Sequence, residues 1–203
     1  MLLHSRGESG ERRPADLNAI LDEYVMLAYH GMRGTDSTFN IKIEKDYDPA
    51  VGRVEIFPQD ISRVFLNLVN NACYATHQKA RVGEGESGRK GDGVSGRLEE
   101  TEAPSHPLTL SPTQPYSPTL TVRTKNLGDK VEIRIRDNGT GIPENVRNKV
   151  FHPFFTTKPT GQGTGLGLSI SYDIIVHEHN GEIKVETEEG KFTEFVIRLP
   201  KGA

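Results

Sequence analysis

Two asparagines, Asn67 and Asn71, lie four residues apart in a stretch whose apolar residues recur at helical spacing, so they share one helix face. Carboxamide oxygens on a rigid helix can ligate Mg²⁺ or its waters, and phosphate oxygens can supply the remaining ligands. At about 100° per residue, both side chains fall at the rim of the core, and Asn70 turns away to solvent. Two asparagines beside an apolar stripe are also common surface residues, so this pair alone does not define a site.

A second polar motif, Asp137-Asn138-Gly139-Thr140-Gly141, directly follows a predicted strand. A carboxylate at the end of a strand can accept a hydrogen bond from an exocyclic amine. The two glycines allow the backbone to approach a flat ring closely. A tight turn capped by an aspartate would have the same composition, so both interpretations stay open from these residues alone.

A third motif, the glycine-rich stretch from Gly161 to Leu168 (GQGTGLGL), runs into a predicted helix. Such a loop aims backbone N–H groups and a helix N-terminus at an anion. It is not a Walker A loop, because no Gly-Lys-Ser/Thr follows, and no strand leads into it as a dinucleotide fingerprint requires. Just upstream, residues 151–158 read FHPFFTTK. Lys158 could meet a terminal phosphate as a point charge, whereas we expect the aromatic residues to anchor the loop to the core.

The elements that must position these motifs follow from hydrophobic periodicity. Helices are predicted from Pro14, from Pro58, after Pro143 and over Leu166–Glu178; strands are predicted at Phe39–Tyr47, Thr119–Lys125, Val131–Arg136, Gly181–Glu188 and Phe192–Leu199. The strands from residue 119 onward form two hairpins, because each pair is separated by a short turn that contains glycine. This order predicts an α+β sandwich with helices layered on one face of a sheet.

Composition bounds the remaining possibilities. Residues 80–118 are rich in Gly, Ser, Glu, Pro, Arg and Lys without a repeating pattern, so we expect a disordered insertion there. A solvated loop is the simpler interpretation of it, and a docking segment is the alternative.

The net charge of -3 leaves no nucleic-acid footprint. A single cysteine excludes an internal disulfide and fits a reducing compartment. No apolar run approaches the roughly 20 residues that span a bilayer. We therefore expect a cytoplasmic chain without direct membrane contact, which stays compatible with a membrane-anchored parent protein.

Taken together, the motifs resemble the conserved boxes of sensor histidine kinases. Residues 65–75 (FLNLVNNACYA) resemble the N box, residues 137–141 the G1 box, residues 151–158 the F box and residues 161–168 the G2 box, in family order. The resemblance covers about residues 36–203 apart from the insertion. It identifies residues 36–203 as the ATP-binding catalytic domain. Residues 1–35 would be the end of a dimerisation helix plus an N-terminal helix.

The resemblance implies the Bergerat (GHKL) fold, an α/β sandwich with a mixed, mostly antiparallel sheet and helices on one face. DNA gyrase, MutL proteins and heat-shock chaperones share this fold. It also implies ATP and Mg²⁺ as cofactors, with Asn71 on the metal and Asn67 supporting it near the phosphates. Asp137 would accept from the adenine amino group, Gly141 would close on the ring, and Thr193 would reach adenine through a water.

Residues 155–165 would form a mobile ATP lid, and the amides of Gly165 to Leu168 would face the phosphates. Lys158 is a possible catalytic residue. The complete predicted ATP-binding set is Asn67, Asn71, Ala75, Asp137, Gly139, Gly141, Ile142, Phe155, Thr156, Lys158, Gly163, Thr164, Gly165, Leu166, Gly167, Leu168 and Thr193.

The sequence also departs from the family pattern. Tyr74 stands where a basic residue is common, Phe192 replaces a common glycine, and no His-Glu-x-x-Thr-Pro-like H box occurs. The implied reaction is thus transfer of the γ-phosphoryl group to a histidine on a dimerisation domain of the same parent kinase, with a response regulator as an indirect partner. None of the seven histidines is marked as an acceptor, and we expect His177 and His179 at the surface or at caps.

Two other functions stay open. One is a stand-alone Ser/Thr kinase of the anti-sigma-factor type, and the other is a GHKL ATPase or nucleotide-gated switch, because a fold alone does not fix a function. We expect the isolated chain to be monomeric, and we expect Cys73 to be a small, core-facing residue rather than a nucleophile.

Overall fold

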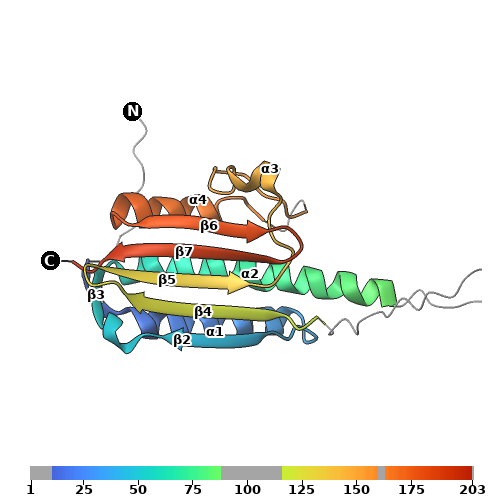
Figure 1. Cartoon of the computed structure of the whole chain (residues 1–203), viewed down its shortest axis with the longest axis horizontal. Helices are drawn as coiled ribbons and strands as arrows, with labels where there is room; N and C mark the ends of the chain where they lie inside the picture. The colour runs from blue at the N-terminus through green and yellow to red at the C-terminus, as the bar shows by residue number, and fades with distance from the viewer. Residues whose placement is uncertain (1–10, 88–115, 160–162, 203) are drawn as a thin grey trace, which may run out of the picture.

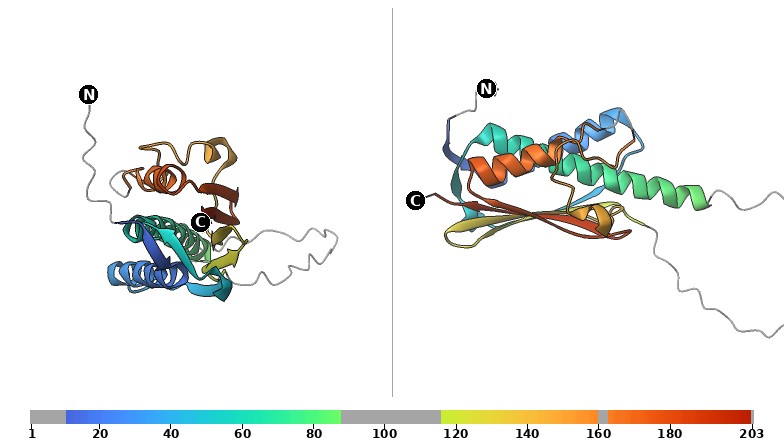
Figure 2. Two further views of the ribbon diagram at one scale, coloured as in Figure 1. Left: turned by 90° about the vertical axis from the view of Figure 1, so that its left-hand side faces the viewer. Right: turned by 90° about the horizontal axis from the view of Figure 1, so that it is seen from above.

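The protein is a two-layer sandwich, seen in the computed structural model of Figure 1, which describes residues 11–87, 116–159 and 163–202. Its helices cover one face of a five-stranded sheet, as the view from above in Figure 2 shows, and the other face is open. This arrangement confirms the predicted α+β sandwich. Among the described residues, no helix is both long and apolar enough to cross a membrane.

The sheet has the strand order β2-β4-β5-β7-β6. Only β2 and β4 pair in parallel, and the other neighbours are antiparallel, which confirms the mixed, mostly antiparallel sheet and both predicted hairpins. The bounds are β2 Lys42–Tyr47, β4 Thr119–Asn126, β5 Lys130–Asp137, β6 Glu182–Glu188 and β7 Phe192–Pro200. Their inward side chains, among them Val122, Ile133 and Ile197, are fully buried beneath the helices.

The N-terminal region differs from the prediction. Pro14 belongs to a short strand, β1 (Arg13–Asp16), which pairs with β3 (Arg53–Ile56) in a separate two-stranded sheet. Helix α1 (Leu17–Thr35) therefore begins at Leu17, where the Asp16 side chain accepts a hydrogen bond from the Ala19 amide at 3.0 Å and caps the helix. The buried residues of α1 share one core with those of α2, so α1 is an integral part of the helical layer.

The central helix α2 (Pro58–Ser87) carries the asparagine motif along the sheet and extends past the ends of the strands, as Figure 1 shows. It covers residues 80–87, which the polar composition assigned to the insertion. After Pro58 no proline interrupts this stretch, so the backbone can stay helical despite its polarity. Residues 116–118 are also described and lead into β4, whereas the remainder of the expected insertion, 88–115, lies outside the described residues.

The C-terminal helical layer starts with α3 (Glu144–Arg147), followed by α4 (Gly167–Tyr172) and a π-helical segment, η2 (Asp173–Glu178). A short 3-10 turn, η1 (Pro49–Val51), joins β2 to β3. His179 caps the C-terminal end of η2 and is 1% exposed, whereas His177 stays exposed as predicted. Of the two positions expected for His179, the cap is confirmed, because its backbone N–H bonds to the Ile174 carbonyl at the end of η2, and the surface position is not.

His179 links the two ends of the helical layer. Its Nε2 accepts a hydrogen bond from the Phe57 amide at 3.0 Å, and its Nδ1 lies 2.8 Å from the Ile174 carbonyl. This pattern requires the neutral ring with its proton on Nδ1. Burial lowers the pKa of His179, in agreement with a neutral ring. Cys73 is fully buried as predicted, and burial raises the pKa of its thiol to about 12.

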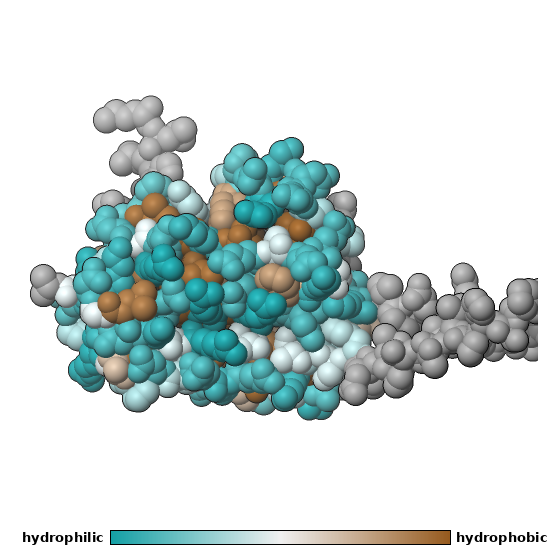
Figure 3. Space-filling model, in the orientation of Figure 1, coloured by the Kyte–Doolittle hydropathy of each residue, from teal (hydrophilic) through white to brown (hydrophobic). Residues whose placement is uncertain are grey.

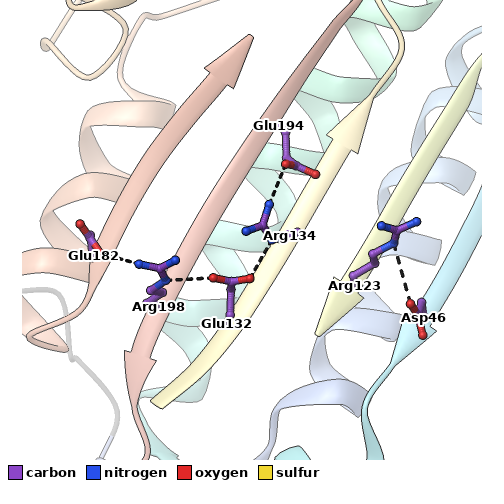
Figure 4. A network of polar contacts seen from close by, with 7 residues as sticks. All are labelled: Asp46, Arg123, Glu132, Arg134, Glu182, Glu194 and Arg198. Carbon is purple, nitrogen blue, oxygen red and sulfur yellow. Dashed lines mark hydrogen bonds and ion pairs between the residues drawn. The ribbon is translucent and has the colours of Figure 1, made fainter. Parts of the chain in front are cut away.

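The open face of the sheet is covered by charged side chains, so that hydrophilic colour dominates that face in Figure 3. Figure 4 shows the network: Glu132 accepts from Arg134 at 2.7 Å and from Arg198 at 2.9 Å, and Arg134 donates to Glu194 at 3.0 Å. Burial alone would raise the pKa of Glu132, but these hydrogen bonds outweigh it and lower the pKa. Because the carboxylates are paired, this face needs no second layer.

Candidate nucleotide-binding site

One cavity of about 320 Å³ opens between α2, the adjacent ends of β5 and β7, the loop after α3 and the start of α4. It brings together most of the predicted site residues: Asn67, Asn71, Ala75, Asp137, Gly141, Ile142, Phe155, Thr156, Lys158, Gly163, Thr164, Gly165, Gly167, Leu168 and Thr193. Gly139 and Leu166 do not line it. Three residues of the predicted lid, 160–162, lie outside the described residues.

Asp137 ends β5 and forms one end of the cavity, directly opposite Thr193 in the neighbouring strand β7. Its side chain is 3% exposed, and Oδ1 accepts a hydrogen bond from the Gly139 amide at 2.8 Å. Burial raises the pKa of Asp137 to about 7, although hydrogen bonds from the Gly139 and Thr193 backbone oppose the shift. A buried carboxylate with free acceptor capacity is suited to an amine donor.

Close approach of neighbouring backbone requires glycine at two positions after Asp137, Gly139 and Gly141. Gly139 packs against α2 instead of lining the cavity, and a Cβ there would lie 2.6 Å from the Ala75 carbonyl carbon. Gly141 has a φ of 67°, and a Cβ there would lie 2.2 Å from the Glu188 carbonyl oxygen. Only glycine meets both demands at Gly141, so the turn can close over the cavity.

Where the loop after α3 reaches α2, the Lys158 ammonium donates a hydrogen bond to Asn71 Oδ1 at 3.0 Å and lies 4.4 Å from the centre of the Tyr74 ring. Burial lowers the pKa of Lys158. Asn67 has a different role, because its Nδ2 donates to the Gly167 carbonyl at 3.1 Å and thereby ties α2 to the start of α4. The Asn71 oxygen thus already faces a cation inside the cavity.

Asn70 was predicted to face solvent, but it is half-buried and lines the same cavity. The prediction failed because the loop that carries Thr156 and Lys158 lies across that side of α2 and turns the rim of the helix into a wall of the cavity.

The aromatic residues of the FHPFFTTK stretch do not act as one anchor. Phe151 packs against Tyr172 and Phe195, with ring centres 5.6 and 6.4 Å apart, as expected. Phe155 instead lines the cavity. Phe154 is 75% exposed and has a φ of 64°, so it anchors nothing in this structure.

Several lining residues were missed by the sequence reasoning: Asn70, Tyr74, Thr140, Val150, Thr157 and Phe195. Thr140 and Thr157 lie inside the predicted motifs, so their position in the chain was a sufficient signal. Phe195 follows from strand alternation, because Thr193 and Phe195 lie on the same face of β7. Val150 had no signal of this kind.

Comparisons with known proteins agree with this geometry. Residues 57–203 match the family described as histidine kinase-, DNA gyrase B- and HSP90-like ATPase. The sensory histidine kinase/phosphatase NtrB of Vibrio alginolyticus is 30% identical over 197 residues, which are 94% of this chain and 45% of that protein. NtrB of Rhizobium leguminosarum bv. phaseoli is 28% identical over 193 residues, or 93% of this chain and 41% of that protein.

Among solved structures, the nucleotide-free catalytic domain of histidine kinase ThkA is 29% identical, with a TM-score of 0.66, and the match covers 95% of this chain and 97% of that domain. ThkA in complex with the response regulator TrrA is 26% identical, with a TM-score of 0.62, over 94% of this chain and 42% of that one. The chain spans less than half the length of the two NtrB relatives. It therefore belongs to the histidine kinase-, DNA gyrase B- and HSP90-like ATPase family, as a catalytic ATP-binding domain of the sensor histidine kinase type.

Proposed function

We propose that this chain binds Mg²⁺-ATP in the cavity and donates the γ-phosphoryl group to a histidine on a dimerisation domain of the same parent kinase. The observation that carries this proposal is the polarity of the cavity: it is lined by a buried carboxylate, Asp137, whose turn packs on Ala75 of α2, and by the Asn71–Lys158 pair one helical turn away. A nucleotide presents an amine at one end and anionic phosphates at the other, so its two ends match these two parts of the lining.

At the first end, the adenine amino group would donate to Asp137, with Thr193 beside it on β7. Gly141 and Ile142 on one side and Ala75 on the other supply close-packed walls for the flat ring. At the second end, the amides of Gly165 to Leu168, where α4 begins, and the Lys158 ammonium would neutralise the phosphates. Phosphoryl transfer consists mostly of such positioning and charge stabilisation.

The residues present fit a magnesium ion. Asn71 Oδ1 points into the cavity, where it accepts from the Lys158 ammonium, and it would become a free oxygen ligand once Lys158 turned to the phosphates. Among the described residues no cluster of three His, Cys, Asp or Glu side chains could hold a metal unaided. Mg²⁺ retains waters and takes substrate phosphate oxygens as ligands, so one carboxamide would suffice here. When bound, the ion would neutralise charge on the phosphates.

A kinase is favoured over a hydrolytic ATPase by the lining of the cavity. Within the described residues, Asp137 is the only carboxylate that lines it, and the Lys158 ammonium contacts Asn71 and the Tyr74 ring instead. Water attack on a phosphate would need a base near that group. The names of the NtrB relatives and of the ThkA–TrrA complex further support a histidine acceptor and a response regulator as an indirect partner. We further propose a cytoplasmic location.

The product of a labelling reaction tests this assignment. With γ-labelled ATP and a histidine-bearing dimerisation domain, we expect acid-labile label on the partner. Acid-stable label would instead indicate a Ser/Thr kinase of the anti-sigma-factor type, and release of free phosphate alone would indicate an ATPase or a nucleotide-gated switch.

Replacement of Asn71 by alanine is expected to abolish the Mg²⁺-dependent increase in ATP affinity, because it removes the α2 oxygen that contacts the Lys158 cation in the cavity. Asn70→Ala is the matched control: it removes the neighbouring carboxamide from the cavity wall and should lower affinity slightly while the response to Mg²⁺ persists. Calorimetric titrations with and without Mg²⁺ measure both effects. Equal loss of the Mg²⁺ response in the two variants would contradict the assignment of Asn71.

A further inference from the structure

A cluster of polar contacts holds the turn behind Asp137, outside the cavity itself. At its centre is Asn138, whose Oδ1 accepts hydrogen bonds from the Thr119 amide at 2.8 Å and from the Tyr116 hydroxyl at 3.1 Å. Its Nδ2 donates to the Ser117 carbonyl at 2.8 Å. The Asn138 carboxamide is thereby fixed to the segment that enters β4.

Lys79 reaches the same turn from α2. Its ammonium donates to the Asn138 main-chain carbonyl at 2.9 Å and lies 4.7 Å from the centre of the Tyr116 ring. The Tyr116 hydroxyl also lies 3.4 Å from the Thr76 carbonyl, one turn back along α2. Lys79 and Tyr116 therefore bridge α2, the start of β4 and the turn after β5, and neither of them lines the cavity.

We propose, resting on the proposed binding of adenine at Asp137, that Lys79 and Tyr116 are positioning residues that hold the Asp137–Asn138 turn, and that the Lys79 charge favours the charged, accepting form of the Asp137 carboxylate. The contacts with Asn138 fix the main chain directly after Asp137. The Lys79 ammonium adds a positive charge behind a carboxylate that is almost fully buried.

The position of the Lys79 charge affects the protonation of Asp137. Burial is the main cause that raises the pKa of Asp137, and the charge of Lys79 is among the effects that lower it. Burial lowers the pKa of Lys79 in turn, and the Asp137 charge opposes that shift. Among the described residues, the other titratable groups that interact with Asp137 are Arg136 on β5, Cys73 on α2 and Tyr116 itself. Apart from Lys79, the cationic group in this set is Arg136. The Arg136 guanidinium lies over the Phe192 ring, 3.7 Å from its centre.

The spacing in the sequence agrees with a role for Lys79. Asn71, Ala75 and Lys79 recur every four residues, so one face of α2 carries the proposed metal ligand, the wall beside adenine and then the lysine. The helix thus contacts both ends of the proposed nucleotide and the turn behind its base.

The test is the pH dependence of binding in Lys79→Met, with adenosine and inorganic triphosphate titrated separately. Removal of the charge should move the midpoint of adenosine binding upward by about one pH unit, because an opposite charge at short range stabilises a carboxylate. At neutral pH the adenosine affinity should fall several-fold, to be regained at higher pH, while triphosphate binding stays unchanged. Lys79→Arg should restore the original midpoint.

Three comparisons make the outcome decisive. Lys184→Met removes an exposed lysine from β6 and should leave the midpoint in place. Tyr116→Phe keeps the ring but removes the hydroxyl that contacts Asn138, so it should lower adenosine affinity without moving the midpoint. If Lys79→Met does not fold, Lys79→Gln replaces it and is measured together with Tyr116→Phe. An unchanged midpoint and affinity in a folded Lys79 variant would overturn this inference alone, whereas absence of adenosine binding to the unaltered chain would overturn the proposed function.

Discussion

Replacement of Asp137 by asparagine is expected to weaken ATP binding by about 1.5–3 kcal/mol, the range for a hydrogen bond to a charged group. The carboxylate already accepts from the Gly139 and Thr193 backbone and would accept the adenine amine as well. An asparagine has only one acceptor oxygen, which the backbone donors would occupy. Its NH₂ group would then face the adenine amine, donor against donor. Equilibrium titration with ATP measures the loss.

The control is Asp129→Asn in the exposed turn between β4 and β5, which should leave ATP affinity unchanged. Because burial raises the pKa of Asp137 to about 7, ATP affinity of the unaltered chain should decline as the pH falls through about 7. Asp137→Asn should lose this pH dependence. Near-normal ATP affinity in a folded Asp137→Asn variant would contradict the role in adenine binding.

The same carboxylate makes a prediction about stability whose sign can be worked out. In the nucleotide-free folded state Asp137 keeps its proton up to about pH 7, whereas an unfolded aspartate releases it near its ordinary value of 3.8. The folded state therefore binds more protons between these two values, and the contribution of Asp137 to the free energy of unfolding decreases as the pH rises across that window. Asp137→Asn, which stays neutral, should remove this decrease. A variant that is at least as stable at neutral pH yet binds ATP poorly would show that stability is sacrificed here for binding.

Elements with strong local signals were predictable from the sequence. The two hairpins follow from strict alternation around glycine-containing turns, and α2 from its long apolar stripe. Strands β1 and β3 were missed because each has four residues and gains its partner from a distant part of the chain, with Arg13 opposite Ile56. Local periodicity carries no information on such pairing.

The site shows the same division between local and tertiary information. Motifs placed Asp137, Asn71 and Lys158 in the set, but the hydrogen bond between Asn71 and Lys158 depends on how a loop returns to a helix 87 residues earlier. Asn70 was misplaced for the same reason, because a neighbouring loop covers its side of α2, and the burial of the cap residue His179 likewise depends on tertiary packing, against Phe57. Periodicity assumes an ideal helix beside solvent.

The largest expected effect concerns self-phosphorylation: this chain alone should bind Mg²⁺-ATP but transfer no phosphoryl group to itself. Among the described residues, no histidine lines the cavity, and the two ring nitrogens of buried His179 are engaged by Phe57 and Ile174. Holding the acceptor in line with the γ-phosphate is worth roughly 7–11 kcal/mol in favourable cases. Without a positioned imidazole this contribution is lost, and labelling should fall to near background.

A dimerisation domain of the same parent kinase, added as a separate polypeptide, should restore part of the transfer. The rate should depend on its concentration, because association without a linker lacks the high effective concentration of a tethered acceptor. The experiment resolves γ-labelled products on a neutral-pH gel, with a partner whose acceptor histidine is replaced as the control. Strong label on this chain alone, mapped to any of its seven histidines, would show that the acceptor lies within it and that the proposed division between nucleotide domain and acceptor domain is wrong.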